Sequence, residues 1–253
     1  MERDSFDGPS PAGRGPTCAI TGAMTQGALS IVLPCLNAAD GLPSTFAALD
    51  EARLLGLLHE VLVVDGGSRD GTAALAAGLG ARVIESAPGR GRQLAKGGVA
   101  ARGDWLFFLH ADSRPEPGWS ETVRAFIADP ANCERAAVFR LRLDDSDPRA
   151  RRVERLAGWR ARRLGLPYGD QGLLMAGVFY RRLGGYRPLE LMEDVDLVRR
   201  IGRRRICLLD HMVVTSARRY RQDGWWARPL RNLALLFGYF LGLPTGLLRR
   251  LYG

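Results

Sequence analysis

The chain has 253 residues, of which 46% are hydrophobic and 25% are charged. These values exclude a wholly disordered chain and a membrane protein with many spanning segments, and the length suits one sizeable α/β domain. The formal charge of +9 favours a polyanionic partner, although charge alone does not rank nucleic acid, an anionic membrane surface, a diphosphate substrate or simple solubility.

The two ends of the chain differ in composition from its middle. Residues 1–27 are rich in Gly, Pro, Ser and Thr and lack the apolar stretch of a signal peptide, which predicts a disordered tail. Residues 28–227 are expected to form one domain, and residues 228–253 a hydrophobic C-terminal segment. The four cysteines lie far apart, so neither a zinc site nor a disulfide framework is indicated, and a cytoplasmic location is favoured.

Strands and helices alternate in the first half of the sequence. Buried strands are expected at residues 29–33, 60–64, 82–85 and 105–109, with helices at 44–58, 72–80 and 93–102. This order predicts a mostly parallel sheet with helices on both faces. Ligands of such sheets bind beyond the carboxyl ends of the strands, so the polar clusters that follow each strand should share one crevice.

The second half is less regular. Helices are predicted at 120–128 and 149–164, a strand at 136–143, and a further helix after the acidic segment 190–196. The apolar core of the C-terminal segment, residues 233–248, is shorter than the about 20 residues of a spanning helix. Two alternatives remain open for it: contact with the inner face of the cell membrane, or packing on the domain or in a homodimer.

The turn after the second strand, residues 65–72, offers two carboxylates and three glycines. Asp65 and Asp70 can accept hydrogen bonds from ribose hydroxyls or a base N–H, and Gly67 lets a ligand approach the backbone beside Ser68. The alternative is an ordinary turn capped by Asp70.

A second polar cluster, His110-Ala-Asp112, follows the fourth strand. Alternate residues of an extended segment point the same way, so His110 and Asp112 are candidate ligands for a divalent cation that bridges the phosphates of a nucleotide donor. A helix-capping Asp112 with a hydrogen-bonded His110 is the alternative.

The third cluster is Glu193-Asp194, at the start of a predicted helix. A carboxylate near a helix N-terminus is stabilised in its charged form, which suits a general base that deprotonates an acceptor hydroxyl. The alternative is a charged first turn without a catalytic role.

These motifs together resemble family 2 glycosyltransferases of GT-A fold. The resemblance is carried by Pro34-Cys-Leu-Asn37, by residues 63–72 and 102–112, and by Glu193-Asp194, and it extends over about residues 29–221. A finer pattern, in residues 168–172, 191–194 and 215–219, is similar to the bacterial subgroup labelled arsenosugar-biosynthesis-type glycosyltransferases.

The resemblance implies a single GT-A domain that transfers a sugar, with inversion, from a nucleotide-diphosphate sugar to an acceptor hydroxyl, with Mn²⁺ or Mg²⁺ as cofactor. Asp194 would be the catalytic base with Glu193 beside it, and Asp112 would bind the metal together with His110. The expected substrate-binding residues are Pro34, Leu36, Asn37, Asp65, Gly67, Ser68, Asp70, Arg92, His110, Ala111, Gly169, Asp170, Gln171, Arg218 and Arg219.

The sequence departs from the family pattern at three places. His110 stands where the metal motif usually has its first acid, and Ala38 and Ala39 replace the acid often found after Asn37. Asp65 is followed by Gly66, where many relatives have a second acid. Two other functions remain as alternatives: a nucleotidyltransferase or other nucleotide-sugar enzyme, and a basic membrane-surface protein without catalysis. No nucleic-acid partner is expected. The acceptor is open, and the apolar C-terminal segment raises a lipid-linked one.

Overall fold

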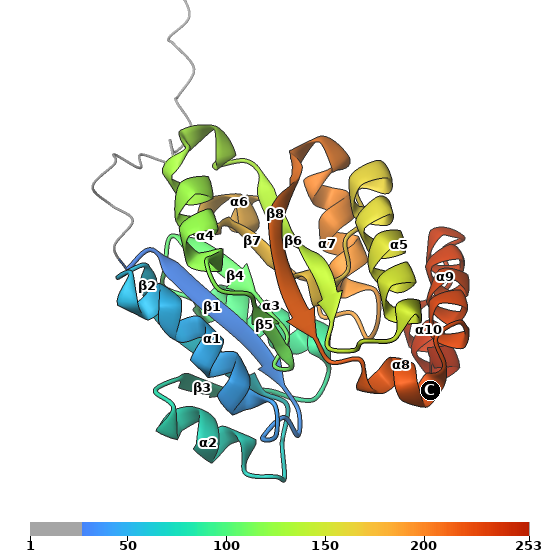
Figure 1. Ribbon diagram of the computed structural model, residues 1–253, viewed down its shortest axis with the longest axis horizontal. Coiled ribbons are helices and arrows are strands. Elements are labelled where there is room, and N and C mark those ends of the chain that lie inside the picture. Colours follow the sequence, from blue (N-terminus) through green and yellow to red (C-terminus); the bar gives the residue numbers. More distant parts are fainter. Residues whose placement is uncertain (1–26, 253) are drawn as a thin grey trace, which may run out of the picture.

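The computed structural model describes residues 27–252, so the predicted N-terminal tail lies outside the described residues apart from Gly27. Eight strands form one curled sheet in the order β3-β2-β1-β4-β7-β6-β8-β5. Helices cover both faces of this sheet, and the C-terminal helices lie at the opposite side of the molecule from β2 and β3 (Figure 1). The predicted α/β architecture of GT-A type is confirmed.

The first half has the predicted alternation of strands and helices. Its pairs β1–β2, β1–β4 and β2–β3 are all parallel. Its elements are β1 (Leu29–Cys35), α1 (Leu42–Leu54), β2 (Leu58–Asp65), α2 (Thr72–Gly78), β3 (Arg82–Glu85), α3 (Arg90–Ala100) and β4 (Trp105–Phe108).

The second half extends the same sheet through mostly antiparallel pairs. Strand β7 runs antiparallel to β4 and β6, and β5 runs antiparallel to β8, whereas β6 and β8 pair in parallel. The elements are β5 (Ser113–Pro115), α4 (Trp119–Ala128), β6 (Ala136–Leu143), α5 (Pro148–Leu164), β7 (Leu173–Ala176), α6 (Gly177–Arg182), α7 (Glu193–Ile201), β8 (Ile206–Thr215), α8 (Arg218–Asp223), α9 (Ala227–Phe240) and α10 (Thr245–Tyr252).

Several predicted boundaries were wrong. Helix α1 ends before Gly56, whose φ of 66° is left-handed, and Leu58 already belongs to β2. In the first turn of α1, the hydroxyl of Thr45 donates to the carbonyl of Ala111 at 2.8 Å. Helix α3 begins at Arg90 rather than at Gln93. Strand β1 also continues through Pro34 to Cys35.

The core lies between the sheet and its helices. Every side chain of β4 is buried, and Trp105 and Phe107 are fully enclosed. Gly97 lets α3 approach β1 closely, because a Cβ atom there would lie 2.4 Å from Cγ1 of Val32. Close packing of this kind fixes α3, and with it the arginines at its N-terminus, relative to the strand ends.

The C-terminal segment folds into two helices, α9 and α10, that pack on α7. Leu235, Leu236 and Leu248 form a small buried cluster with Met192 and Val195. Among residues 27–252, the structure contains no helix that is both long and apolar enough to cross a membrane.

Candidate active site

The carboxyl ends of β1 and β2 are joined by a network of short polar side chains. Asp65, which is 6% exposed, accepts hydrogen bonds from the N–H groups of Gly67 and Ser68 at 3.1 and 3.0 Å. Asn37 donates its N–H to the Ser68 hydroxyl, and its Oδ1 accepts from the N–H of Arg69, both at 2.9 Å. The φ of 50° at Asn37 is the left-handed conformation that Asn tolerates.

Asp70 closes the same network. It accepts from the N–H groups of Ala39 and Thr72, both at 3.0 Å, and the Thr72 hydroxyl with these groups holds the pKa of Asp70 below its usual value. Many of the polar groups predicted to bind a ligand therefore form hydrogen bonds within and between the loops that follow β1 and β2. Leu36, half exposed, is at the surface of this edge.

Cys35 lies buried beneath these carboxylates. Burial, followed by the negative charges of Asp65, Asp70 and Asp112, raises the pKa of its thiol to about 12. Burial is the larger cause of this raised pKa, and the three predicted site residues add to it through their negative charges.

Gln93 is a structural contributor that the sequence analysis missed. Its amide Nε2 donates to the carbonyls of Cys35 and Val64, both at 2.7 Å, so it ties α3 to the ends of β1 and β2. The residue stands within Gly89-Arg-Gly-Arg-Gln93, a glycine-rich string that the sequence marks as a loop but whose contacts it does not specify.

A small pocket lies between α3, the end of β4 and the start of α7. Arg90 ion-pairs there with Glu193, whose side chain is only 1% exposed. Burial acts to lower the pKa of Arg90, but Glu193 and Asp194 outweigh it and raise the pKa above its usual value. The pocket is lined by Arg90, Leu94, Phe108, Leu109, His110, Gly169, Leu173, Tyr186, Glu193 and Asp194.

Asp194 is held in one orientation by two backbone groups. The N–H of Gly169 donates to its Oδ2 at 2.9 Å, and the N–H of Val195 donates to its Oδ1 at 2.8 Å. Each carboxylate oxygen has a second lone pair, so the group can still accept a proton from a ligand. Of the predicted residues, the pocket therefore brings together Asp194, Glu193, His110 and Gly169.

His110 is directed into this pocket. Its Nε2 lies 3.5 Å from Nη1 of Arg90, and a Cβ atom at residue 169 would come within 2.8 Å of it, so the position requires glycine. Burial, then the charges of Arg90 and Arg219, lower the pKa of His110 to about 3. The imidazole is therefore neutral at physiological pH.

Asp112 lies on the exposed turn between β4 and β5. No hydrogen bond or ion pair engages its carboxylate within residues 27–252. That same stretch holds no cluster of three or more His, Cys, Asp or Glu side chains placed to bind a metal. The residues present therefore fit a cation that takes no more than two ligands from the protein and its remaining ligands from phosphate oxygens and water, a common arrangement for Mg²⁺.

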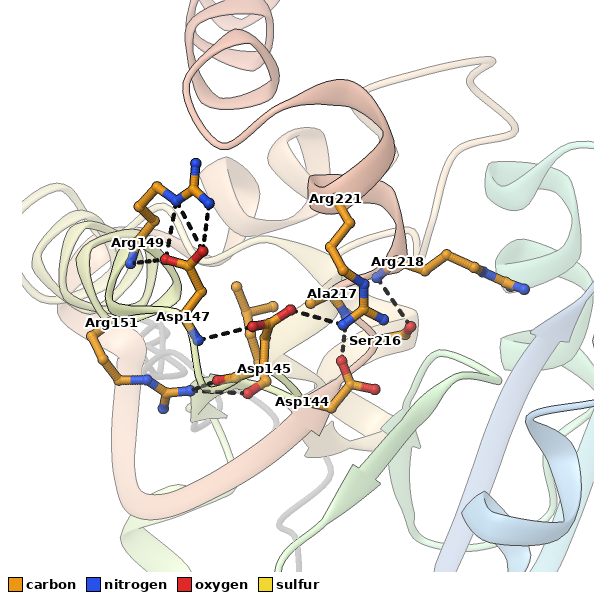
Figure 2. A network of polar contacts seen from close by, with 10 residues as sticks. Asp144, Asp145, Asp147, Arg149, Arg151, Ser216, Ala217, Arg218 and Arg221 are labelled. Atoms are coloured by element: carbon orange, nitrogen blue, oxygen red, sulfur yellow. Dashed lines mark hydrogen bonds and ion pairs between the residues drawn. The ribbon is translucent and has the colours of Figure 1, made fainter.

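The arginines of α8 are held at the edge of the site by aspartates. Asp144 accepts from the N–H of Ala217, and Asp145 pairs with Arg221 at 2.8 Å. Figure 2 shows the side chain of Arg218 extending away from these aspartates. In the described part of the chain no carboxylate pairs with Arg218 or Arg219, and the charge of Arg219 acts on His110.

Three further predicted residues, Arg92, Gln171 and Asp170, differ in burial and in the part of the fold that they contact. Arg92 is exposed, whereas Arg90, two residues earlier, reaches the pocket. Gln171 is fully buried and donates to the carbonyl of Phe139 at 2.9 Å, so it faces β6. Asp170 is partly buried, and no hydrogen bond satisfies its Oδ1 within residues 27–252. Burial raises the pKa of Asp170, with Arg160 opposing.

Comparison with known proteins agrees with this geometry. Residues 30–179 match the family model described as Glycosyl transferase family 2. An uncharacterised glycosyltransferase of Mycobacterium tuberculosis is 34% identical over 184 residues, which cover 67% of this chain and 79% of the relative. A glucosyl-3-phosphoglycerate synthase of Mycolicibacterium paratuberculosis is 36% identical over 93 residues, or 33% of this chain and 28% of that protein.

Solved structures show the same fold. Glucosyl-3-phosphoglycerate synthase from Mycobacterium tuberculosis, crystallised with Mn²⁺, UDP and glucosyl-3-phosphoglycerate, aligns with a TM-score of 0.54 at 22% identity, covering 79% of this chain and 77% of that one. Mannosyl-3-phosphoglycerate synthase from Rubrobacter xylanophilus gives 0.55 at 21% identity, covering 77% and 74%.

The fold and the matches together define a glycosyltransferase of GT-A fold. The match to the family model extends over more than half of the chain, and the mycobacterial relative supports it at 34% identity. The chain belongs to glycosyl transferase family 2.

Proposed function

We propose that the protein is an inverting, metal-dependent glycosyltransferase that uses a nucleotide-diphosphate sugar and in which Asp194 is the general base. The observation that carries the proposal is the fixed carboxylate of Asp194 in a pocket with Arg90, His110 and Glu193. In a single displacement, the acceptor oxygen attacks the anomeric carbon, its proton passes to Asp194, and the bond from that carbon to the diphosphate oxygen breaks.

We propose uridine diphosphate as the nucleotide, because the M. tuberculosis glucosyl-3-phosphoglycerate synthase binds UDP with Mn²⁺ or Mg²⁺. Asp65, Asn37 and Ser68, with Pro34, Leu36, Gly67, Asp70 and Ala111 around them, would form the nucleoside site at the ends of β1 and β2. The unsatisfied Oδ1 of Asp170 supports a hydrogen bond to a sugar hydroxyl in this proposal.

Asp112, with His110, would hold Mn²⁺ or Mg²⁺. The cation supplies charge neutralisation for the diphosphate as it leaves. Arg218 and Arg219, which lack carboxylate partners in the described residues, would add positive charge from α8, with Arg92 on the opposite rim. Pairing with Arg90 would keep the Glu193 side chain fixed beside the base.

The acceptor is proposed to be a hydroxyl compound. A lipid-linked acceptor would reach the site if the C-terminal helices contact a membrane. Membership of the arsenosugar-type subgroup is a proposal that rests on residues 168–172, 191–194 and 215–219, and it assigns no acceptor.

A thermal-shift panel tests the donor and metal assignments. We expect UDP with Mn²⁺ to raise the melting temperature by about 5–10 °C at roughly 100 times its Kd, and UDP without Mn²⁺, GDP, dTDP and CDP to raise it much less. Asp112→Ala should lose the Mn²⁺-dependent part, whereas the nearby, exposed Asp40→Ala should keep it.

The outcomes separate the parts of the proposal. If none of the nucleotides raised the melting temperature, a nucleotide-sugar donor would be contradicted altogether. If Asp112→Ala kept the Mn²⁺-dependent shift of the wild type, Asp112 would not be a metal ligand, but the donor assignment would stand. If another nucleotide gave the largest shift, the nucleobase of the proposed donor would change, but the donor would still be a nucleotide-diphosphate sugar.

A further inference from the structure

The C-terminal helices expose a continuous row of large apolar side chains. On α9 these recur at the helical spacing of i, i+3, i+7 and i+11, and they continue into the following turn and α10. Phe237 is 64% exposed and Leu241 is 68% exposed. The set, called here the hairpin face, consists of Trp226, Leu230, Leu233, Phe237, Phe240, Leu241, Leu243, Leu247 and Leu251.

The hairpin face is not needed to hold the helices on the domain. The opposite side of α9 and α10 does this, through Leu235, Leu236 and Leu248 packed on Met192 and Val195. A contiguous exposed apolar surface on a folded domain marks a site of interaction. The protein therefore has a core-facing side and an outward-facing apolar side on the same pair of helices.

The charge around the hairpin face is positive. Residues 224–253 contain four arginines and no Asp or Glu. The guanidinium of the exposed Arg199 lies 5.0 Å over the ring of Phe240, and Arg250 is exposed on α10. Of the neighbouring acids, Asp223 is paired with Arg228 and Arg231, which leaves Glu190 beside α10.

We propose that the hairpin face binds the surface of an anionic lipid bilayer. Apolar side chains bounded by arginines suit the boundary between headgroups and acyl chains, where buried apolar area and attraction to anionic lipid act together. Helix α9 has 14 residues, fewer than the about 20 that span a bilayer, so it lies along the surface.

Two other occupants fit less well. Residues 1–26 contain only Met1, Phe6, Ile20 and Met24 as large hydrophobic side chains, too few to cover nine. A second copy packed face to face would bring Arg199 and Arg250 of the two copies close to one another, with Glu190 of each copy to offset only part of that charge. Charge complementarity therefore favours an anionic membrane.

Membrane contact at this face would bring the candidate active site near the lipid. Helices α9 and α10 pack on Met192 and Val195, the residues on either side of Glu193 and Asp194. This placement favours an acceptor whose hydroxyl is presented at the bilayer surface, an inference that rests on the proposed function.

Vesicle flotation tests the proposal without any requirement for catalysis. We expect the intact protein to float with vesicles that contain phosphatidylglycerol and much less with pure phosphatidylcholine. Leu233→Glu combined with Phe237→Glu should lower the bound fraction about tenfold or more, because two carboxylates would enter the apolar layer. The control is Leu54→Glu on α1, where an equally apolar side chain is 88% exposed away from the hairpin face.

Three results would overturn the proposal: no flotation of the intact protein, equal flotation on both lipids, or a double variant that floats like the wild type. A dimer seen by light scattering and abolished by the double variant, without vesicle binding, would assign the face to a second copy. Circular dichroism checks that the variants fold. The thermal shift with nucleotide tests donor binding independently of vesicle flotation, so either proposal can fail while the other stands.

Discussion

At the scale of single residues, Asp194 is distinguished from its neighbour Asp196 by what engages each carboxylate. Two backbone N–H groups orient Asp194 in the pocket, whereas Asp196 accepts from Arg187 and Arg200. Arg200 also donates to the carbonyls of Leu183 and Gly185. One acid is thus free to take a proton, and the other holds α7 to the preceding loop.

We therefore predict that Asp194→Asn lowers the transfer rate by about 10²–10⁴-fold while leaving the UDP–Mn²⁺ thermal shift intact, since the amide keeps the size but cannot act as a base. Asp196→Asn should instead lower the melting temperature and change kcat of the folded protein only slightly. The comparison uses initial rates of UDP release. Full turnover by Asp194→Asn would refute its role as base.

His110 couples the site to acid stability. Its pKa is lowered to about 3 in the folded protein, so between pH 3 and about 6.5 the unfolded chain binds a proton that the folded protein does not. Stability is therefore lost as pH falls below about 6.5. We expect the free energy of unfolding to fall by about 2 kcal/mol from pH 7 to pH 5 because of His110. The variant His110→Asn should not show this fall.

Urea denaturation at the two pH values measures this difference, with His59→Asn on the exposed part of β2 as the control. The control should keep the wild-type difference between pH 7 and pH 5. If His110→Asn also kept it, a protonated His110 would be tolerated in the folded protein and the neutral imidazole would be wrong.

The sequence identified the polar residues His110, Gly169, Glu193 and Asp194 of the pocket but not Arg90. Arg90 and Arg92 belong to the same glycine-rich string, and only the first residue of α3 decides which of the two points inward. The predicted start at Gln93 left both arginines in a loop, where their directions are undetermined. Gln93 was missed for a related reason, because its acceptors on β1 and β2 are 58 and 29 residues away.

At the scale of elements, the first half was predictable because each strand is a short apolar run followed by a turn signal. Strands β5, β7 and β8 were not predicted. Strand β5 has three residues and β7 four, and β8 contains Asp210 and His211 within its length. Their partners supply the stabilisation that local propensity lacks, and the pairing of Ser113 with Thr215 joins residues 102 positions apart.

The short helix α8 depends on aspartates outside it, which leads to a further prediction. Asp145→Asn should release Arg221 and loosen the helix that carries Arg218 and Arg219, so that KM for the donor rises several-fold with kcat nearly unchanged. Asp147→Asn is the matched control, because Asp147 pairs with Arg149 of α5 instead (Figure 2). Steady-state kinetics at varied donor concentration distinguish the two; equal KM values would contradict a role of α8 in donor binding.

At the scale of the whole molecule, the parallel half of the sheet carries the predicted nucleotide residues and the antiparallel half carries Asp194 and Gly169. The two halves meet where β4 pairs antiparallel with β7. The family and the GT-A fold followed from motifs in the sequence, but the curl of the sheet that brings β5 beside α1 did not, since it arises from pairings between distant segments.

The buried thiol at the end of β1 has a consequence for the chemistry of the protein in the cell. Thiolates, not thiols, react with peroxides and alkylating reagents, and a pKa of about 12 leaves on the order of one Cys35 in 10⁵ ionised at pH 7. Burial, with the neighbouring carboxylates adding to its effect, thus protects Cys35 from oxidation. A strand end that would be vulnerable with an ordinary thiol is chemically inert.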